Sequence, residues 1–247
     1  MPNAIVLKLA AAYRDLMNNL FYVWVGRDKR PVYYDVAETF PELGLADEHY
    51  ETIRRELMAV LPQQEQMRLY HDVDGGQRLI SGNDEKAWRV FFLRVIGDRV
   101  KLPADELCPK SVEVMQRIPN LLEAFFSILE PGKSIPSHNG IFYGYLRYHL
   151  AFKVPKRNPP SIRIKDTVYT WKEGESVLFD DSWNHEVFNQ ADETRVVLII
   201  DVMRPMPWPL HFMNKTWPTL KRWIGVGPTD DRFELMKPGK QAGSAQA

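Results

Sequence analysis

The chain has 247 residues, of which 45% are hydrophobic, enough to bury one substantial core. Its 32 basic and 32 acidic side chains cancel to a formal net charge of zero, so no basic field is available to hold nucleic acid without sequence preference. The single cysteine, Cys108, cannot form an internal disulfide and favours a reducing compartment such as the cytoplasm, and the apolar runs fall short of the ~20 residues that a membrane-spanning helix needs.

Two helices are predicted in the first part of the chain. Residues 4–21 place apolar side chains on one side of a helical pattern. The stronger pattern covers residues 47–61, where apolar residues recur at helical spacing. Asp47 can cap the start of this helix, and Pro62 follows its end, where proline can no longer extend a helix.

A strand and a short helix are predicted next. Residues 87–97 are rich in aromatic and β-branched side chains and indicate a strand, and Pro109 can begin a helix that runs to about Gln116. No linker separates this half of the chain from the next. Residues 1–85 are therefore expected to pack outside the following core as a helical and mixed support region.

The second half of the chain is a series of short strands. From about residue 123, β-rich segments alternate with turn signals such as the Pro-Gly pair in "EAFFSILEPGK". Regular spacing of this kind predicts a sandwich or a barrel. We place this core at residues 86–207, and residues 208–247 are expected to form a tail whose small, polar end is disordered.

Two of these strands carry charged side chains on a face that a barrel would bury. Because side chains alternate along a strand, Arg147 and His149 share one face of "YLRYHLAF", and Arg195 shares a face with Val197 and Ile199. A buried arginine needs a partner, because an isolated buried cation is very costly. No Asp or Glu stands in an obvious position to pair with these arginines, so the pattern predicts a bound anion.

Each candidate residue also has a plain structural interpretation. His138 and His185, taken singly, are strand histidines of a kind that is usually structural or exposed, and the arginines could lie on a solvated face. Ser127 could be a core hydroxyl, and Asp180 and Asp181 could be turn formers. The functional signal lies in the order and spacing of these residues together.

That order and spacing resemble the aspartyl/asparaginyl β-hydroxylase family, which also contains bacterial lipid A and ornithine-lipid hydroxylases. The matching text is "FSILEPG", "HNG" followed by "LRYHL", "WKEGESVLFDDSWNHEV" and "TRVVLIIDVMRP". The resemblance implies a mainly β fold with a double-stranded β-helix, the jelly-roll core also found in cupins. It further implies a hydroxylase that uses Fe(II), 2-oxoglutarate and O2 and releases succinate and CO2.

The resemblance implies that His138 and His185 are the iron ligands. The usual carboxylate position, two residues after His138, holds Gly140, as it does in the aspartyl branch of the family. Iron(II) accepts imidazole and oxygen ligands, 2-oxoglutarate supplies two oxygens, and water can fill the remaining position. Asp181 matches a residue close to the metal-bound water, where it would offset metal charge without ligating the metal.

Four further positions match residues around the cosubstrate. The resemblance places Arg195, with Ser127, on the distal carboxylate of 2-oxoglutarate. His149 matches a position near the cosubstrate, and Arg147 matches a position near the cosubstrate or a substrate carboxylate. These matches complete the expected site.

The substrate is left open by these patterns. Tyr145 stands where the aspartyl branch carries another arginine, which favours an acyl lipid or small molecule over an Asp or Asn side chain of a protein. The tail "PWPLHFMNKTWPTLKRW" sets tryptophans beside basic residues, which suits a membrane interface. We favour a tail packed on the barrel, because a compact fold must cover its apolar surface. The expected location is the cytoplasm, with peripheral contact to the inner face of a membrane as the alternative.

Two rival functions share the same fold. A 2-oxoglutarate-dependent halogenase would use the space at Gly140 for chloride, although glycine already occurs there in hydroxylases of the family. An inactive jelly roll that serves as a binding module would not need the iron and cosubstrate residues. The intact set of His138, His185 and Arg195 argues against that second reading.

Overall fold

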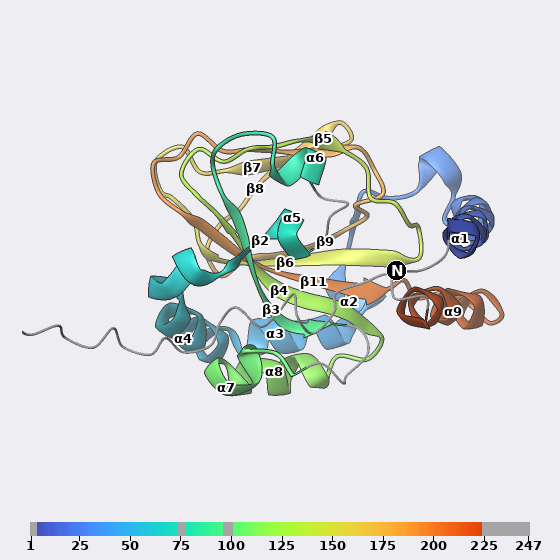
Figure 1. Cartoon of the computed structure of the whole chain (residues 1–247), viewed down its shortest axis with the longest axis horizontal. Coiled ribbons are helices and arrows are strands. Elements are labelled where there is room, and N and C mark those ends of the chain that lie inside the picture. Colours follow the sequence, from blue (N-terminus) through green and yellow to red (C-terminus); the bar gives the residue numbers. More distant parts are fainter. Residues whose placement is uncertain (1–3, 74–77, 96–100, 224–247) are drawn as a thin grey trace, which may run out of the picture.

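The computed structural model describes residues 4–73, 78–95 and 101–223, and Figure 1 shows its layers. Two antiparallel sheets face each other, and a layer of helices covers the outer side of the larger sheet. The predicted disorder at the end of the tail concerns residues outside this description.

The strands divide between a large sheet of order β1-β9-β6-β11-β4-β3-β2 and a small sheet of order β5-β10-β7-β8. Their bounds are β1 (Tyr33–Tyr34), β2 (Arg68–Leu69), β3 (Trp88–Val95), β4 (Leu121–Leu129), β5 (Ile135–His138), β6 (Tyr145–Lys153), β7 (Ser161–Ile164), β8 (Thr167–Thr170), β9 (Ser176–Phe179), β10 (His185–Phe188) and β11 (Arg195–Met203). From β4 to β11 the chain crosses repeatedly between the two sheets, and only the β7–β8 hairpin stays within one. This is the topology of a double-stranded β-helix, as the sequence predicts.

Strand β11 forms the middle of the large sheet. It pairs with β4 on one side and β6 on the other, and all its residues are buried. Its run of valine, leucine and isoleucine is typical of a strand that is covered on both faces. Arg195 at the start of this strand and Asp201 within its second half are therefore held in fixed positions inside the protein.

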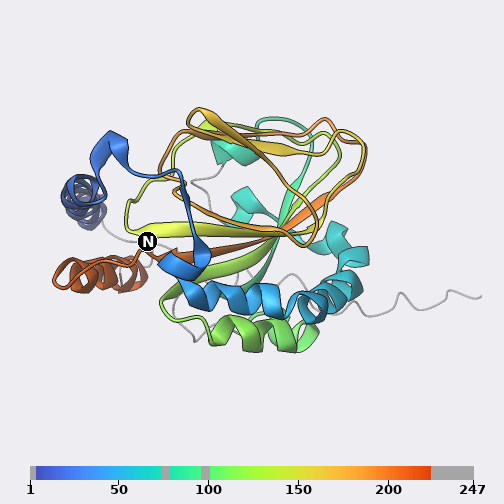
Figure 2. The ribbon, with the colours of Figure 1, turned by 180° about the vertical axis from the view of Figure 1, so that it is seen from behind.

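Two groups of helices flank the barrel, and the two views agree on both (Figures 1 and 2). The helix bounds are α1 (Ala4–Trp24), α2 (Val36–Thr39), α3 (Gly44–Glu48), α4 (Tyr50–Val60), α5 (Tyr70–Val73), α6 (Arg78–Ser81), α7 (Ala104–Leu107), α8 (Pro109–Gln116) and α9 (Leu210–Trp223), with short 3-10 turns η1 (Arg27–Lys29), η2 (Pro41–Leu43) and η3 (Leu61–Gln66). Helices α3, α4, α7 and α8 lie under the large sheet, whereas α1 and α9 pack together at one end of the barrel.

The helix predicted over residues 47–61 is present, but its start was predicted wrongly. Helix α4 begins at Tyr50, and Asp47 lies inside the preceding helix α3 instead of capping α4. The Asp47 carboxylate accepts a hydrogen bond of 2.7 Å from the Tyr148 hydroxyl of β6. A buried tyrosine hydroxyl needs a partner, so this contact ties the helical layer to the barrel wall.

The N-terminal region also contributes strands to the barrel wall. Strand β1 pairs with β9 at one edge of the large sheet, and β2 pairs with β3 at the other. The predicted support region is thus continuous with the sheet it covers, and both sheet edges are extended by the first part of the chain.

The predicted packing of the tail is confirmed for Trp217. Its ring lies 5.9 Å from that of Phe142, and the neighbouring Thr216 hydroxyl is 2.5 Å from the Tyr13 hydroxyl of α1. Trp208, just before α9, is 81% exposed, and the Trp223 side chain lies outside the described residues. Among the described helices, none has the length and apolar character required to cross a membrane.

Candidate functional site

The two candidate metal ligands meet between neighbouring strands of the small sheet. His138 ends β5 and His185 begins β10, and the two residues are direct partners in the antiparallel register. Directly opposed residues point to the same side of a sheet, so the rings come together. Their ring centroids are 4.1 Å apart.

Backbone contacts orient both imidazoles in the same way. The Nδ1 of His138 donates to the Pro136 carbonyl, and the Nδ1 of His185 donates to the Trp183 carbonyl, each over 2.8 Å. With the proton on Nδ1, the lone pair of each neutral ring is on Nε2. Burial lowers the pKa of both histidines to about 4, so both are neutral near pH 7. A neutral imidazole with Nδ1 held by a carbonyl is the usual form of a metal-binding histidine.

The Asp181 carboxylate fills the space beside Gly140. The Gly140 amide donates to the Asp181 carbonyl over 2.9 Å, and a Cβ at position 140 would lie 2.4 Å from Asp181 Oδ1. Asp181 Oδ2 accepts from the Tyr145 hydroxyl at 2.8 Å and lies 3.1 Å from Arg147 Nη1, whereas the buried Oδ1 has no hydrogen-bond partner. The carboxylate missing from position 140 is therefore replaced in space by a carboxylate from the loop before β10.

The Gly140 contact leads to a stability prediction. Gly140→Ala should lower the free energy of unfolding by about 1–3 kcal/mol, the usual cost of overpacking, because Cβ would also lie 2.9 Å from the backbone oxygen of Asp181. Gly44→Ala is a matched control, since a Cβ there meets nothing within 4 Å. Urea unfolding of both variants measures the difference, and equal stability would contradict this crowding.

Arg147 has acidic partners that were not predicted. Its guanidinium donates two hydrogen bonds of 2.7 Å to Asp201 of β11 and also pairs with Asp181. The register places Arg147 directly opposite Asp201, so the pair follows from the alignment of β6 with β11. The expectation that this arginine lacks a carboxylate partner was wrong, and its donors are already engaged.

Arg195 fits the original expectation of an unpaired interior cation. It is 1% exposed, and among the described residues no carboxylate forms an ion pair with it. Its Nη1 donates weakly to the Ser127 carbonyl and hydroxyl at 3.4 and 3.3 Å, its Nε has no partner, and its guanidinium lies 4.5 Å from the Trp171 ring centre. Burial lowers the pKa of Arg195 to about 9, so it remains charged near pH 7 and favours an anion beside it.

Ser127 lies next to the Arg195 guanidinium, and its hydroxyl proton is available for a further hydrogen bond. The Ser127 oxygen accepts from Trp88 Nε1 at 3.0 Å and from Arg195 at 3.3 Å. A hydroxyl whose oxygen accepts from two donors keeps its O–H for a further acceptor. Ser127 and Arg195 can therefore both donate to one carboxylate.

His149 projects from β6 into the same interior. Its ring packs against Trp171 and Phe179, with centroids 5.8 and 4.8 Å away, and neither ring nitrogen has a hydrogen-bond partner. Burial, reinforced by the charges of Arg147 and Arg195, holds the pKa of His149 well below its usual range. A neutral, buried imidazole with both nitrogens unused can donate one hydrogen bond and accept another.

The unpartnered polar atoms are concentrated around the predicted residues. Buried donors and acceptors are nearly always satisfied in folded proteins, so such a group of exceptions indicates a missing polar ligand. At the site these atoms are Asp181 Oδ1, both ring nitrogens of His149, Arg195 Nε and Trp171 Nε1, and others in the described residues, such as Gln64 Oε1 and Asn214 Oδ1, lie elsewhere. Across the described ranges, no third Cys, His, Asp or Glu joins the two histidines in a metal-binding group.

Several contributors to the site were not recognised in the sequence. Trp88, Trp171 and the Tyr145 hydroxyl carry no local pattern that marks them, because only the folded barrel brings them to Ser127, Arg195 and Asp181. Asp201 had a usable signal, since an acidic residue in the middle of "VVLIIDVM" requires a buried cation as partner.

Asp180 has a larger structural role than a turn former. Its buried carboxylate pairs with Arg30 at 3.1 Å and Arg204 at 2.7 Å, and it also accepts from the Ser182 hydroxyl. Arg30 lies over the Trp183 ring, 3.6 Å from its centre. This cluster holds the loop between β9 and His185 and fixes the entry to β10.

Comparison with known proteins identifies relatives of this chain. The family model described as Aspartyl/Asparaginyl beta-hydroxylase matches residues 47–205. An ornithine lipid ester-linked acyl 2-hydroxylase from Rhizobium tropici is 39% identical over 79% of this chain and 68% of its own. The human aspartyl/asparaginyl beta-hydroxylase is 30% identical over 64% of this chain, which spans only 20% of that protein. Among solved structures, a Cupin 2 conserved barrel domain protein from Salinispora arenicola aligns over 52% of this chain and 83% of its own, with 13% identity and a TM-score of 0.32. By the extent of the family match, this chain belongs to the aspartyl/asparaginyl β-hydroxylase family.

Proposed function

We propose that this chain is an Fe(II)- and 2-oxoglutarate-dependent hydroxylase. The observation that carries the proposal is one barrel interior with two neutral histidines sharing an orientation, an unpaired buried arginine and a group of unsatisfied polar atoms. These features support a cation and an anion bound in the same interior, and a metal with a dicarboxylate would supply both.

The residues present suit a divalent metal. His138 and His185 would hold it through Nε2, since Nδ1 of each ring is bonded to a backbone carbonyl. The cluster of Arg147, Asp181 and Asp201 carries one net negative charge beside them, which offsets part of a metal charge. Asp181 would serve through its unpartnered Oδ1, as an acceptor for a water or hydroxyl proton.

The other end of the interior suits the distal carboxylate of 2-oxoglutarate. Arg195 and Ser127 provide the donors, and Trp88 and Trp171 hold these two side chains in place. His149 packs against Trp171, the ring that also lies beside Arg195. It would contribute a hydrogen bond to the cosubstrate there.

When bound, the metal and 2-oxoglutarate supply the oxidising chemistry that inserts oxygen into an unactivated C–H bond. The protein residues position both groups and exclude water. Tyr145 and Arg147 hold the Asp181 carboxylate in one orientation through Oδ2, so Oδ1 stays directed away from these partners. Fixed polar groups of this kind need no rearrangement during reaction.

The structure and the comparisons favour an acyl lipid as the substrate class. Arg147, the residue that the resemblance places near a substrate carboxylate, already contacts Asp201 through two nitrogens and Asp181 through the third. Tyr145 replaces a second arginine and directs its hydroxyl to Asp181. The identity to the rhizobial lipid hydroxylase extends over more of this chain than the identity to the human enzyme.

The proposal is tested by turnover of purified protein with Fe(II), 2-oxoglutarate and O2. Ornithine lipid and an Asp-containing peptide are supplied in parallel, with mass spectrometry for the gain of one oxygen and for succinate. We expect oxygen gain in the lipid acyl chain only. Oxygen gain in the peptide alone would overturn the substrate class, and no metal-dependent succinate with either compound or with crude lipid extract would overturn the reaction class. Gain of chlorine in chloride buffer would identify a halogenase.

A further inference from the structure

The exposed apolar surface of this protein is concentrated at one end. Most of the large apolar side chains that the described residues expose lie on α1, near the start of α9, or in the loop after Gly140. Folded soluble domains seldom leave a continuous apolar patch open, and such a patch usually marks a contact site.

Helix α1 carries this surface as a single stripe. Leu9, Leu16, Leu20 and Val23 follow one another at intervals of seven, four and three residues, which places them on one helix face, and Trp24 ends the stripe. Each of these side chains is between 43% and 66% exposed. We call these five residues the apolar ridge.

The opposite side of α1 is already bound to the protein. Met17 and Phe21 are fully buried, and Phe21 contacts the Phe142 ring at 5.7 Å. Because one face is fixed, only the ridge face is available for another contact. Trp208 and Phe212, which are 81% and 63% exposed, lie just before and in the first turn of α9, the helix that packs against α1 (Figure 1).

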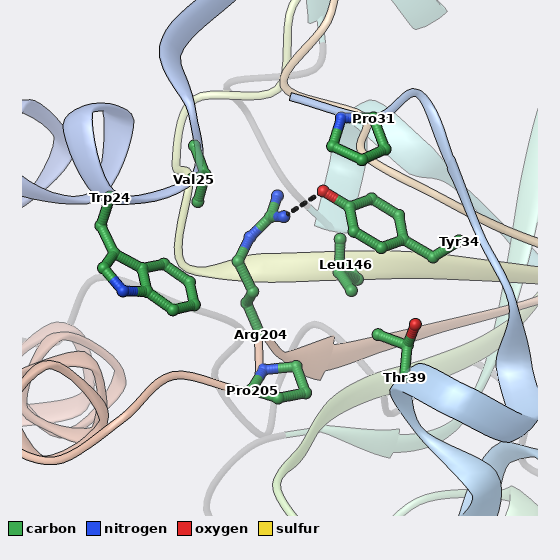
Figure 3. A pocket seen from close by; sticks show the side chains of 8 residues that line it. All are labelled: Trp24, Val25, Pro31, Tyr34, Thr39, Leu146, Arg204 and Pro205. Carbon is green, nitrogen blue, oxygen red and sulfur yellow. Dashed lines mark hydrogen bonds between the residues drawn. The ribbon is translucent and has the colours of Figure 1, made fainter. Parts of the chain in front are cut away.

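A cavity of about 200 Å³ adjoins the end of the ridge, and Trp24 forms part of its wall (Figure 3). Its other walls include Val25, Pro31, Leu146 and Pro205. The Arg204 guanidinium also faces this cavity, but it donates to the Tyr34 hydroxyl at 2.8 Å and pairs with Asp180. With that cation already engaged, the cavity extends the apolar surface without forming an anion site.

The charged side chains of α1 and α9 are predominantly positive. Among the α1 and α9 residues whose side chains the structure describes, three are basic and one is acidic, whereas the whole chain has equal numbers of each. The single acid, Asp15, pairs with Arg14 at 2.8 Å. An apolar stripe with tryptophan at its end and basic residues around it matches the interface of an anionic bilayer.

Helix α1 and the segment that follows it are bonded to the loops next to the two candidate metal ligands. Asn18 donates to the Ile141 carbonyl at 2.8 Å and accepts from the Tyr143 amide at 3.0 Å, just after Gly140. Arg30, beyond the end of α1, pairs with Asp180 shortly before His185. A surface that docks on α1 would therefore lie next to the loops around the site.

We infer that α1 and α9 form a docking surface for an anionic lipid bilayer, with the apolar ridge entering the interface. The inference rests on the proposed function, in which the substrate is an acyl lipid. Docking would bring the site to a substrate that resides in a membrane. Docking itself requires neither metal nor cosubstrate. It can therefore be measured separately from the reaction.

The test is flotation of the full chain, without metal, on vesicles of phosphatidylcholine mixed equally with phosphatidylglycerol. We expect binding that weakens with added salt and is much weaker on phosphatidylcholine alone. The variant Leu9→Glu/Leu16→Glu should bind at least about tenfold more weakly, because two apolar side chains no longer enter the interface. The matched control Leu79→Glu/Val168→Glu alters two exposed apolar residues elsewhere and should bind like the unmodified protein.

Circular dichroism and 2-oxoglutarate binding establish that both double variants are folded. Absence of vesicle binding by the unmodified protein would overturn the inference, as would equal binding by the ridge variant. Light scattering that shows a dimer, converted to a monomer by Leu9→Glu/Leu16→Glu, would identify a second copy of the chain as the occupant instead. Vesicle binding without any hydroxylation would reject the proposed reaction and leave the docking surface standing.

Discussion

Arg195→Ala should weaken 2-oxoglutarate binding by about 2–4 kcal/mol, roughly 30-fold to 1,000-fold, the scale for removing one partner of a buried charged pair. Arg195 is the interior cation for which the described residues offer no carboxylate, and a two-pronged guanidinium contact is only partly replaced by lysine. The affinity of Arg195→Lys for 2-oxoglutarate should therefore lie between that of the unmodified protein and that of Arg195→Ala. Anaerobic titration with 2-oxoglutarate in the presence of Mn(II) measures the affinities.

A shape-matched variant separates ligand binding from a structural role. Arg195→Met retains most of the side-chain volume and removes an uncompensated buried charge, so it should lose the affinity while the ligand-free protein keeps or gains stability. Arg157→Ala is the surface control, since its ion pair with Asp192 is solvent-exposed and should not affect affinity. Affinity equal to that of the unmodified protein in both Arg195→Ala and Arg195→Met would reject the role of Arg195.

The second large effect concerns the metal. Fe(II), or Mn(II) as an inert substitute, should stabilise the unmodified protein by about 2.7 kcal/mol at a concentration 100 times its Kd. For a chain of this size, that corresponds to a rise in Tm of about 5–10 °C. His138→Ala and His185→Ala should each abolish the rise, because each removes one of the two imidazoles that meet between β5 and β10.

Two controls test the selectivity of the metal effect. His49→Ala removes a partly exposed histidine that contacts Arg117 in the helical layer, and the metal-induced rise should remain. Asp181→Asn should reduce the rise without abolishing it, because Asp181 is proposed to act through a water and not as a ligand. A metal-induced rise that persists in both His138→Ala and His185→Ala would show that the metal binds elsewhere, and its complete loss in Asp181→Asn would show direct ligation by the carboxylate.

The sequence by itself determined the type of fold and several of its elements. Helix α8 spans the predicted Pro109–Gln116, and strands β3 to β11 lie within the core placed at residues 86–207, whereas β1 and β2 come from the region expected to lie outside it. These features depend on local chemistry: alternation of side chains, β-branched residues and turn-forming pairs act over a few residues. The set of His138, His185 and Arg195 was also visible, because its spacing resembles a known family pattern.

Tertiary structure alone decided the partners of the charged side chains. Arg147 meets Asp201, 54 residues away, because the register of β6 against β11 places them opposite each other. Asp181 reaches the space beside Gly140 because a backbone hydrogen bond joins the two loops. Strand register and loop contact depend on packing between distant segments, which local periodicity does not specify. The sequence treated Arg147 and Arg195 alike. Only the folded protein shows that Arg147 has carboxylate partners and that Arg195 has none among the described residues.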